Sequence, residues 1–167
     1  MISETNLCHA DDLYVSGYAS LFGVQDISGD VVRKGAFSAS LLKRGGAPLP
    51  MLFGHETVTP IGVWDRLVED ANGLFVEGRL LRAPKSHRHI RRLVKAGALS
   101  GLSIGYRAQR FSKRAAGGRD LLELDLWEVS IVAFPMLRDA RLQLRDTAQP
   151  APQSLSYLTP QLPKRTA

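Results

Sequence analysis

The sequence predicts a single β-rich α+β domain with several strands and two or three short helices. A length of 167 residues with 44% apolar composition suits one globular domain with a real core. Apolar and β-branched residues come in short runs separated by Gly, Pro and Asn-Gly turns, which favours strands. Helical spacing is confined to short segments. We expect the domain at 13–145, between a flexible N-terminus (1–12) and a flexible Pro- and Gln-rich tail (146–167).

The N-terminal half predicts three elements before the first hairpin. The run 13–23, LYVSGYASLFG, has the aromatic and β-branched content of a strand. GAFSASLLKRGG at 35–46 places Phe37, Leu41 and Leu42 on one helical face and ends on a glycine pair suited to a C-terminal cap. The Pro-bounded apolar run PLPMLFGHE follows. These patterns predict a strand, a short helix and a second strand.

The middle and C-terminal segments continue the same alternation. PIGVWDRLVED and GLFVEGRLL flank Asn72-Gly73, which predicts an antiparallel hairpin. Residues 84–97, PKSHRHIRRLVKAG, carry Ile90, Leu93 and Val94 at helical spacing. Five basic residues turn outward from that helix: Lys85, Arg88, Arg91, Arg92 and Lys95. Two further strands are expected on either side of a polar loop at 113–119.

The net charge of +6 is concentrated in one block. Residues 78–119 hold twelve Lys or Arg and no Asp or Glu, so the rest of the chain is net negative. Such a block can attract nucleic acid or steer an acidic polypeptide, and it can equally be an ordinary solvated surface. The composition leaves these interpretations open.

Several classes of protein are disfavoured. No apolar run approaches the roughly 18 residues of a membrane span, and the first residues lack a secretory signal, so we expect a cytoplasmic location. Cys8 is the single cysteine, and the four histidines have no recognisable zinc spacing. We therefore expect no internal disulfide, no metal and no cofactor.

The short motif GLSIG makes Ser103 a candidate nucleophile, although small residues around a serine also describe an ordinary strand. In a strand, Ser103 shares its face with Gly101 and Gly105, while Leu102 and Ile104 point the other way. A substrate peptide could lie on the face that these two glycines clear, and we predict that they bind it. The alternative is that the glycines let another element pack closely.

A nucleophilic serine needs a base, and all four histidines precede residue 103. That order excludes the nucleophile elbow of α/β-hydrolases, whose histidine follows the serine. His9 lies near the terminus, and His87 and His89 fall on the basic helix, where we expect exposure to solvent. His55, at the end of an apolar run, is the best candidate, with a satisfied structural histidine as the alternative.

A third site residue is sought in LELDLWEVSIVAF. As a strand over 122–134, this segment places Glu128 on the face of Leu124 and Leu126 and places Asp125 on the opposite one. A carboxylate among apolar residues needs a partner, because unpaired buried charge costs several kcal/mol. That partner could be an imidazolium, or Arg107 or Arg110 on the neighbouring strand.

Several blocks together resemble the tailed-phage prohead protease family. They cover about residues 13–138 and read, in order, GYASLFG, GDVVRKGAFSASL, PMLFGHE, PIGVW, GLFVEGRL, ALSGLSIGY and LWEVSIVAFP. The resemblance implies a serine endopeptidase of capsid maturation with a fold similar to herpesvirus assemblin, an antiparallel β-barrel core flanked by a few helices. By position it implies Ser103 as nucleophile, His55 as base and Glu128 as the orienting residue.

The same resemblance implies substrates and a location. Scaffold segments, the N-terminal region of the major capsid protein and the protease itself would be cleaved inside the assembling procapsid, in the host cytoplasm. A homodimer is expected from the assemblin likeness. A histidine base, with a reference pKa of about 6.5, predicts activity that falls below that pH. The rival interpretation is a non-catalytic capsid-assembly or nucleic-acid-binding module in which Ser103 is structural.

Overall fold

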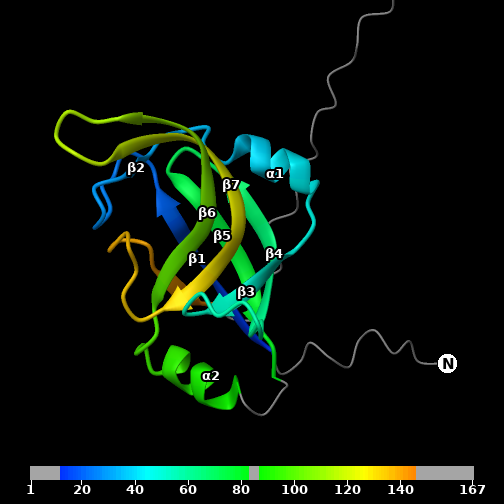
Figure 1. Cartoon of the computed structure of the whole chain (residues 1–167). Helices are drawn as coiled ribbons and strands as arrows, with labels where there is room; N and C mark the ends of the chain where they lie inside the picture. The colour runs from blue at the N-terminus through cyan, green and yellow to red at the C-terminus, as the bar shows by residue number, and fades with distance from the viewer. Residues whose placement is uncertain (1–11, 83–86, 146–167) are drawn as a thin grey trace, which may run out of the picture.

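A curved eight-stranded sheet with two helices forms the described part of the chain, residues 12–82 and 87–145 of a computed structural model (Figure 1). This confirms the prediction of a β-rich α+β domain. The strands are β1 (Leu13–Leu21), β2 (Val31–Val32), β3 (Leu49–Phe53), β4 (Gly62–Glu69), β5 (Gly73–Leu80), β6 (Gly101–Lys113), β7 (Arg119–Val132) and β8 (Leu142–Leu144). The helices are α1 (Ser38–Arg44) and α2 (Arg88–Lys95).

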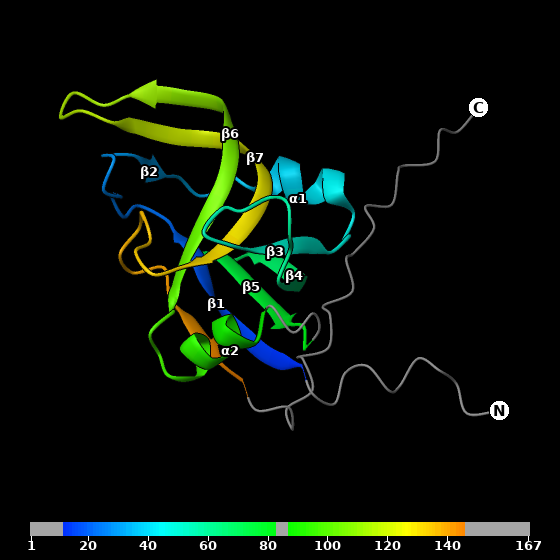
Figure 2. The ribbon, with the colours of Figure 1, turned by 60° about the horizontal axis from the view of Figure 1, so that its bottom comes forward.

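The expected antiparallel β-barrel core is corrected in two respects, because the sheet is mixed and is not closed into a barrel. Its order is β2-β7-β3-β4-β5-β1-β8, with β6 on β7, and β2 and β3 run parallel to β7. At the seam, β6 is joined to the segment before β8 by one isolated bridge between Gly101 and Arg141. Leu102 donates there to the Ala140 carbonyl, and in the described part of the chain no ladder joins β6 to β1, so the sheet stays open between these two strands. Figure 2 shows how far the β6–β7 hairpin extends from the rest of the sheet.

Strand β7 is the centre of the arrangement. One of its edges pairs with β6 along almost the whole length of the hairpin. The other edge binds β2, then the α1 segment, then β3. The α1 segment fills the gap between the two short strands, because Leu124 N–H donates to the Ala36 carbonyl and Leu126 N–H donates to Ser40 Oγ. Segments that lie 78 to 89 residues before their partners in β7 are thereby brought to one strand, from Met51 opposite Val129 to Val31 opposite Asp120.

The core lies on the concave side of the curved sheet. Trp64 is fully buried there, and its indole N–H donates to the Val129 carbonyl at 2.9 Å. The other large, fully enclosed side chains are Val15, Phe37, Leu49, Met51, Leu74, Leu80, Leu102, Leu121, Leu124, Leu126 and Ile131. Burial of so many apolar side chains, at about 1.5–3 kcal/mol each, dominates the stability of the fold.

A β-bulge at Trp127 changes which face of β7 each residue takes. Tyr106 pairs with Leu126 and Gly105 pairs with Glu128, so Trp127 is left without a partner across the ladder. Leu126 therefore faces the core, Trp127 is 58% exposed, and Glu128 leaves the core face. The prediction that Glu128 shares a face with Leu124 and Leu126 was wrong, because an unpaired residue reverses the alternation of a strand.

The other predicted elements are largely confirmed. β4 and β5 form the expected hairpin, and β6 and β7 flank the predicted polar loop. Three side chains differ from expectation: Leu42 is 83% exposed because Ser40 faces β7 instead, Leu93 is 39% exposed, and His87 is buried. Strands β2 and β8, of two and three residues, were not predicted.

The predicted flexible ends, apart from Asp12, fall outside the described residues, as do Cys8, His9, Pro84 and Lys85. Within the described ranges, neither helix is long and apolar enough to cross a membrane.

Candidate active site

The three predicted site residues come from neighbouring strands. Ser103 lies on β6 directly opposite Ser130 of β7, and Gly105 lies opposite Glu128. His55 follows β3, which pairs with the other edge of β7. Because strands lie about 4.8 Å apart, three adjacent strands place nucleophile, carboxylate and imidazole within reach of one another.

The side chains make a continuous chain of contacts. His55 Nε2 lies 3.1 Å from Ser103 Oγ, and His55 Nδ1 lies 2.6 Å from Glu128 Oε1. Because a carboxylate only accepts hydrogen bonds, Nδ1 carries the proton that is shared with Glu128. In the neutral ring, Nε2 is then free to accept the Ser103 hydroxyl proton. This is the arrangement of a base poised on a hydroxyl nucleophile.

The three candidate site residues differ in their exposure to solvent. Ser103 is 6% exposed and the Glu128 side chain 11%, whereas the His55 side chain is 45% exposed. A shielded carboxylate interacts strongly with its partner, because little water screens the contact. The imidazole keeps access to solvent, and therefore to an incoming substrate and water.

The backbone of His55 is held in an unusual conformation. Its φ is +65°, the only positive value among the described residues other than glycine, and Gly54 before it has φ +59°. A tight turn closed by the Glu56 N–H and the Phe53 carbonyl follows directly from β3. A left-handed conformation costs a non-glycine residue about 1–3 kcal/mol, so the surrounding contacts must hold it in place.

Ser130 supplies one of those contacts and was not predicted as a site residue. It is fully buried, its Oγ accepts the His55 backbone N–H at 2.9 Å, and its hydroxyl donates to Glu128 Oε2 at 2.8 Å. The period-two spacing from Glu128 to Ser130 was visible in the sequence. That spacing does not show the role of Ser130, because only the β3–β7 pairing brings the His55 backbone to this serine.

A pocket of ≈ 140 Å³ opens beside Ser103 at the seam between β6 and β1. Its walls come from Leu102 to Tyr106 on β6, from 19–20 on β1, from the loop residues 26–30, and from 136–137, with Arg119 at one side. The candidate nucleophile therefore borders a cavity large enough for one side chain, since an engineered cavity of about 150 Å³ holds benzene.

Comparison with known sequences assigns the chain to a family. The sequence model of the caudovirus prohead serine proteases matches residues 2–153, almost the whole chain. The chain belongs to the caudovirus prohead serine protease family. It is 32% identical to the prohead protease of Enterobacteria phage HK97 over 122 residues, which are 71% of this chain and 54% of that protein. It is 30% identical to the prohead protease of Escherichia phage T5 over 132 residues, which are 78% of this chain and 61% of that protein.

These two prohead proteases are longer than the present chain, which spans just over half the length of each. Two solved structures share the fold. The capsid assembly protease of bacteriophage T4 matches with a TM-score of 0.61 and 12% identity, over 72% of this chain and 81% of that one. The protease of Kaposi's sarcoma-associated herpesvirus, solved with a hexapeptide phosphonate inhibitor, matches with a TM-score of 0.59 and 18% identity, over 81% of this chain and 66% of that one. The expected likeness to the herpesvirus protease fold is confirmed.

In this member of the prohead protease family, protein atoms fill the space beside both glycines of the motif. A Cβ on Gly105 would lie 2.2 Å from Glu128 Oε1, and one on Gly101 would lie 2.7 Å from Pro135 Cδ. The close packing that was the alternative interpretation thus accounts for both residues. Their predicted role in binding substrate stays a prediction.

The alternative partners for the acidic residues of β7 lie elsewhere. Arg110 approaches Glu123 at 3.6 Å, and Asp125 accepts the Trp127 indole N–H at 3.1 Å. Arg107 lies opposite Asp125 in the ladder, one pair beyond the bulge. Glu128 is therefore left to His55 and Ser130.

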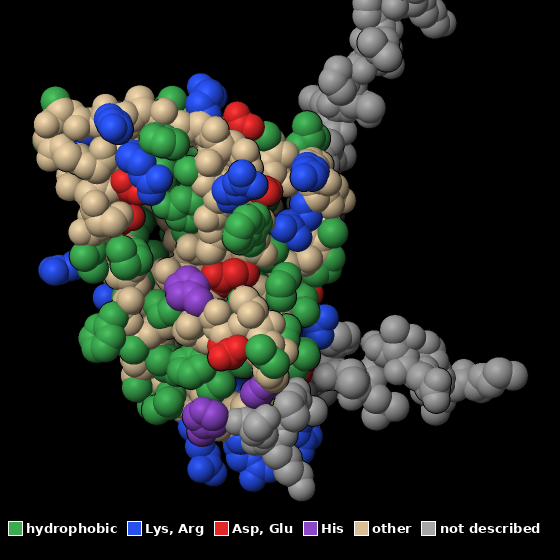
Figure 3. Space-filling view, in the orientation of Figure 1, with side chains coloured by type: hydrophobic (Ala, Val, Ile, Leu, Met, Phe, Trp, Pro, Cys, Tyr) green, Lys and Arg blue, Asp and Glu red, His purple; other side chains and the backbone are tan. Residues whose placement is uncertain are grey.

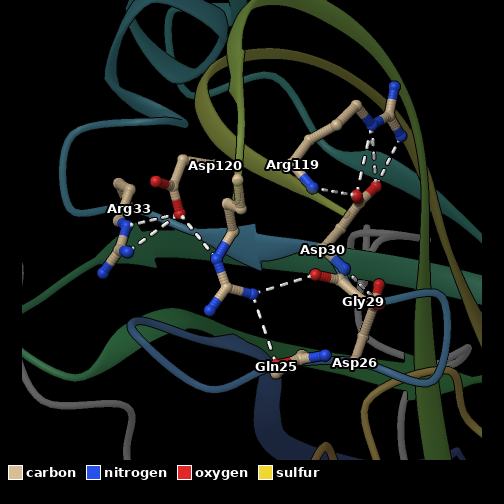
Figure 4. A network of polar contacts seen from close by, with 8 residues as sticks. Gln25, Asp26, Gly29, Asp30, Arg33, Arg119 and Asp120 are labelled. Carbon is tan, nitrogen blue, oxygen red and sulfur yellow. Dashed lines mark hydrogen bonds and ion pairs between the residues drawn. The ribbon is translucent and has the colours of Figure 1, made fainter. Parts of the chain in front are cut away.

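Part of the predicted basic block is paired with acids from outside it: Arg79, Arg110, Arg114 and Arg119 each form an ion pair. Arg119 binds Asp30, and Arg33 from outside the block shares Asp120 with the hairpin (Figure 4). A group of cations covers the lower end of the space-filling view, over α2, where Arg88, Arg92 and Lys95 are exposed (Figure 3). Strand β6 carries exposed cations as well, so the basic block is divided between this helix and the strand of Ser103.

Proposed function

We propose that the chain is a serine endopeptidase of phage-like capsid maturation. One observation carries the proposal: His55 is within hydrogen-bonding distance of both Ser103 Oγ and Glu128, and Ser103 lies at the edge of a pocket. Membership of the prohead serine protease family supports it.

Each side chain then has one role in acyl transfer. His55 Nε2 takes the hydroxyl proton as Ser103 Oγ attacks the scissile carbonyl, and backbone N–H groups bind the developing oxyanion. Glu128 keeps the Nδ1 proton in place and stabilises the imidazolium that forms. His55 returns the proton to the leaving amine, and water, activated by the same imidazole, hydrolyses the acyl-enzyme.

The substrates we propose are scaffold segments and the N-terminal region of the major capsid protein, with the protease itself. The reaction would take place inside the assembling procapsid, in the host cytoplasm. The prohead proteases of phages HK97 and T5 and the capsid assembly protease of phage T4 support this assignment by their names. The homodimer stays a prediction.

The direct test is covalent labelling. A fluorophosphonate should add its mass to the purified wild type, and the same intact-mass measurement reports self-cleavage. Ser103→Ala should remove both the adduct and any self-cleavage. Ser112→Ala is the matched control, because Ser112 is an exposed serine on the same strand. Adducts that survive Ser103→Ala would exclude Ser103 as the nucleophile.

A second experiment separates a dormant enzyme from a non-catalytic module. The wild type and Ser103→Ala are each co-expressed with the major capsid protein proposed as the substrate. We expect a shortened capsid protein with the wild type alone. Equal capsid protein mass in both, together with no labelling, would favour the assembly-module interpretation.

A further inference from the structure

The pocket beside Ser103 carries an inference that rests on the proposed function and deepens it. The pocket lies where the sheet fails to close, between β6 and β1, and the nucleophile stands on its rim. Leu102 points its backbone N–H away from β7, toward Ala140, and by the alternation of a strand Ile104 points the same way. Among the described residues no strand pairs with this edge of β6 at Ile104, so an extended chain whose side chain enters the pocket can bind there.

Two carboxylates, Asp26 and Asp30, line the pocket. The Asp30 carboxylate is already matched, because it accepts the Arg119 backbone N–H at 2.8 Å and pairs with the guanidinium of the same residue (Figure 4). This pair contributes no net charge to the pocket.

Asp26, in contrast, is only partly satisfied by hydrogen bonds. Its Oδ1 accepts the Ser28 hydroxyl at 2.7 Å and the Asp30 backbone N–H at 2.9 Å. Among the described residues, no hydrogen bond or ion pair reaches Oδ2. The carboxylate is thus fixed through one oxygen and offers the other, so the pocket holds one uncompensated negative charge.

The loop that carries Asp26 is anchored rather than loose. Ile27 N–H donates to the Met136 carbonyl at 2.9 Å, which joins the loop to the opposite wall of the pocket. Arg114 Nη1 donates to the Gly29 carbonyl at 3.1 Å, which joins it to the β6–β7 hairpin. A pocket whose charged residue is held in place before binding loses less entropy when a ligand enters.

The electrostatics at Tyr106, also in the wall, agree with this charge balance. Burial raises the pKa of the Tyr106 hydroxyl, and the negative charges of Asp30 and Asp26 raise it further against the opposing effect of Arg119. Leu102 and Ile104 form an apolar wall near the nucleophile. Apolar walls next to the nucleophile and a carboxylate elsewhere in the lining match a side chain with an aliphatic stem and a cationic tip.

We propose that this pocket is the specificity site for the substrate residue whose carbonyl Ser103 attacks, and that it selects a cationic side chain, lysine before others, through Asp26. Lysine fits better than arginine because its ammonium is compact and because Arg119 already occupies one side of the pocket. Substrates with glutamate at that position would meet the free carboxylate and be rejected.

The test uses three peptidyl diphenyl phosphonates that differ only in the side chain next to phosphorus: lysine, norleucine or glutamate. Ser103 Oγ would displace one phenoxide from phosphorus, and intact mass gives the labelling rate of the wild-type chain. We expect the lysine probe to react at least about tenfold faster than its uncharged isostere, norleucine, and the glutamate probe to react slowest. Equal rates for lysine and norleucine, or a preference for glutamate, would overturn the inference.

Two variants locate the effect. Asp26→Asn keeps an acceptor for Ser28 and should bring the lysine and norleucine rates close to equality. Asp139→Asn is the matched control, an exposed aspartate on the loop of the opposite wall, and should keep the wild-type ratio. A ratio that survives Asp26→Asn would assign the selectivity elsewhere. The wild-type ratio decides the inference even where a variant fails to fold.

Different results would refute the proposed function and the proposed role of the pocket. A fluorophosphonate carries no such side chain and reports Ser103 alone. If it labels the wild type but the lysine probe has no advantage, the pocket assignment is wrong and the nucleophile stands. If no probe labels the purified chain, including the fluorophosphonate, labelling is repeated on the chain co-expressed with the capsid protein, and no label on Ser103 there overturns both proposals.

Discussion

The backbone N–H of His55 donates to the side-chain oxygen of Ser130 at 2.9 Å. This bond ties the residue with φ +65° to the strand that also carries Glu128, and the Ser130 hydroxyl holds the far oxygen of that carboxylate. Two residues of β7 therefore position His55: Ser130 holds its backbone N–H, and Glu128 holds its imidazole.

Ser130→Ala should slow fluorophosphonate labelling roughly 10- to 100-fold, because an imidazole displaced by a fraction of an ångström loses its alignment with Ser103. Thermal unfolding should also shift, since two buried polar groups lose a partner. Ser40→Ala is the control: Ser40 is likewise buried and accepts a backbone N–H, that of Leu126, outside the site. An equal loss of labelling in both variants would reduce Ser130 to a purely structural role.

Glu128→Gln should lower the labelling rate and any peptide hydrolysis by roughly 10²- to 10⁴-fold, because an amide can hold the wrong imidazole tautomer and cannot stabilise the imidazolium. The fold should persist, since the amide fills the same space. Glu123→Gln, on the same strand and paired loosely with Arg110, should leave the rate at the wild-type value. A fully active Glu128→Gln would remove this residue from the mechanism.

Gly105→Ala separates catalysis from stability. The added Cβ would collide with the end of the Glu128 side chain, 2.2 Å away, and that flexible group can yield by leaving His55. We expect labelling to fall about tenfold or more while the melting temperature changes little. Gly101→Ala meets the Pro135 ring and the Val132 carbonyl and should lower the melting temperature instead. Full activity in Gly105→Ala would contradict the prediction and show that Glu128 can accommodate the added methyl group without leaving His55.

Charge reversal on α2 tests one of the roles left open for the basic block, the steering of an acidic polypeptide substrate such as a scaffold segment. Arg88 and Arg92 are the exposed residues to change, because Arg91 is engaged with the Leu80 carbonyl. Arg88→Glu with Arg92→Glu should lower scaffold processing on co-expression, through the loss of electrostatic steering. Lys34→Glu with Lys43→Glu makes the same change in net charge at exposed positions outside the basic block. Unchanged processing in the α2 variant would end this prediction.

Acid should weaken the β4–β5 turn. Burial tends to raise the pKa of Asp70, but the Tyr18 hydroxyl and the backbone N–H groups of Asn72 and Gly73 outweigh it and lower that pKa. A carboxyl with a depressed folded pKa stabilises the protein above its unfolded pKa and loses that contribution as pH falls through the folded value. The difference in melting temperature between wild type and Asp70→Asn should therefore shrink below about pH 4. A difference that is constant with pH would contradict this.

The sequence by itself determined the longer strands and the hairpins, and it supplied the candidate site residues. Local periodicity was enough for β1 and the β4–β5 and β6–β7 hairpins, because these depend on neighbouring residues and on turn chemistry. The combined motifs around His55 and Ser103 were enough to identify the family. Local patterns could not show that β2 and β3 run parallel to β7, since such pairing joins residues 78 to 89 positions apart, from Met51 with Val129 to Val31 with Asp120.

The tertiary structure alone decided how the site is assembled. One residue without a partner in the ladder, Trp127, turns Glu128 from the core face toward His55. The alternation of apolar residues in the sequence does not predict where such a bulge occurs. The role of Ser130 and the charge of the Asp26 pocket likewise follow from contacts between distant segments. A strand's sequence fixes which residues alternate, whereas register, bulges and the choice of neighbouring strand depend on the free energy of the whole packed sheet.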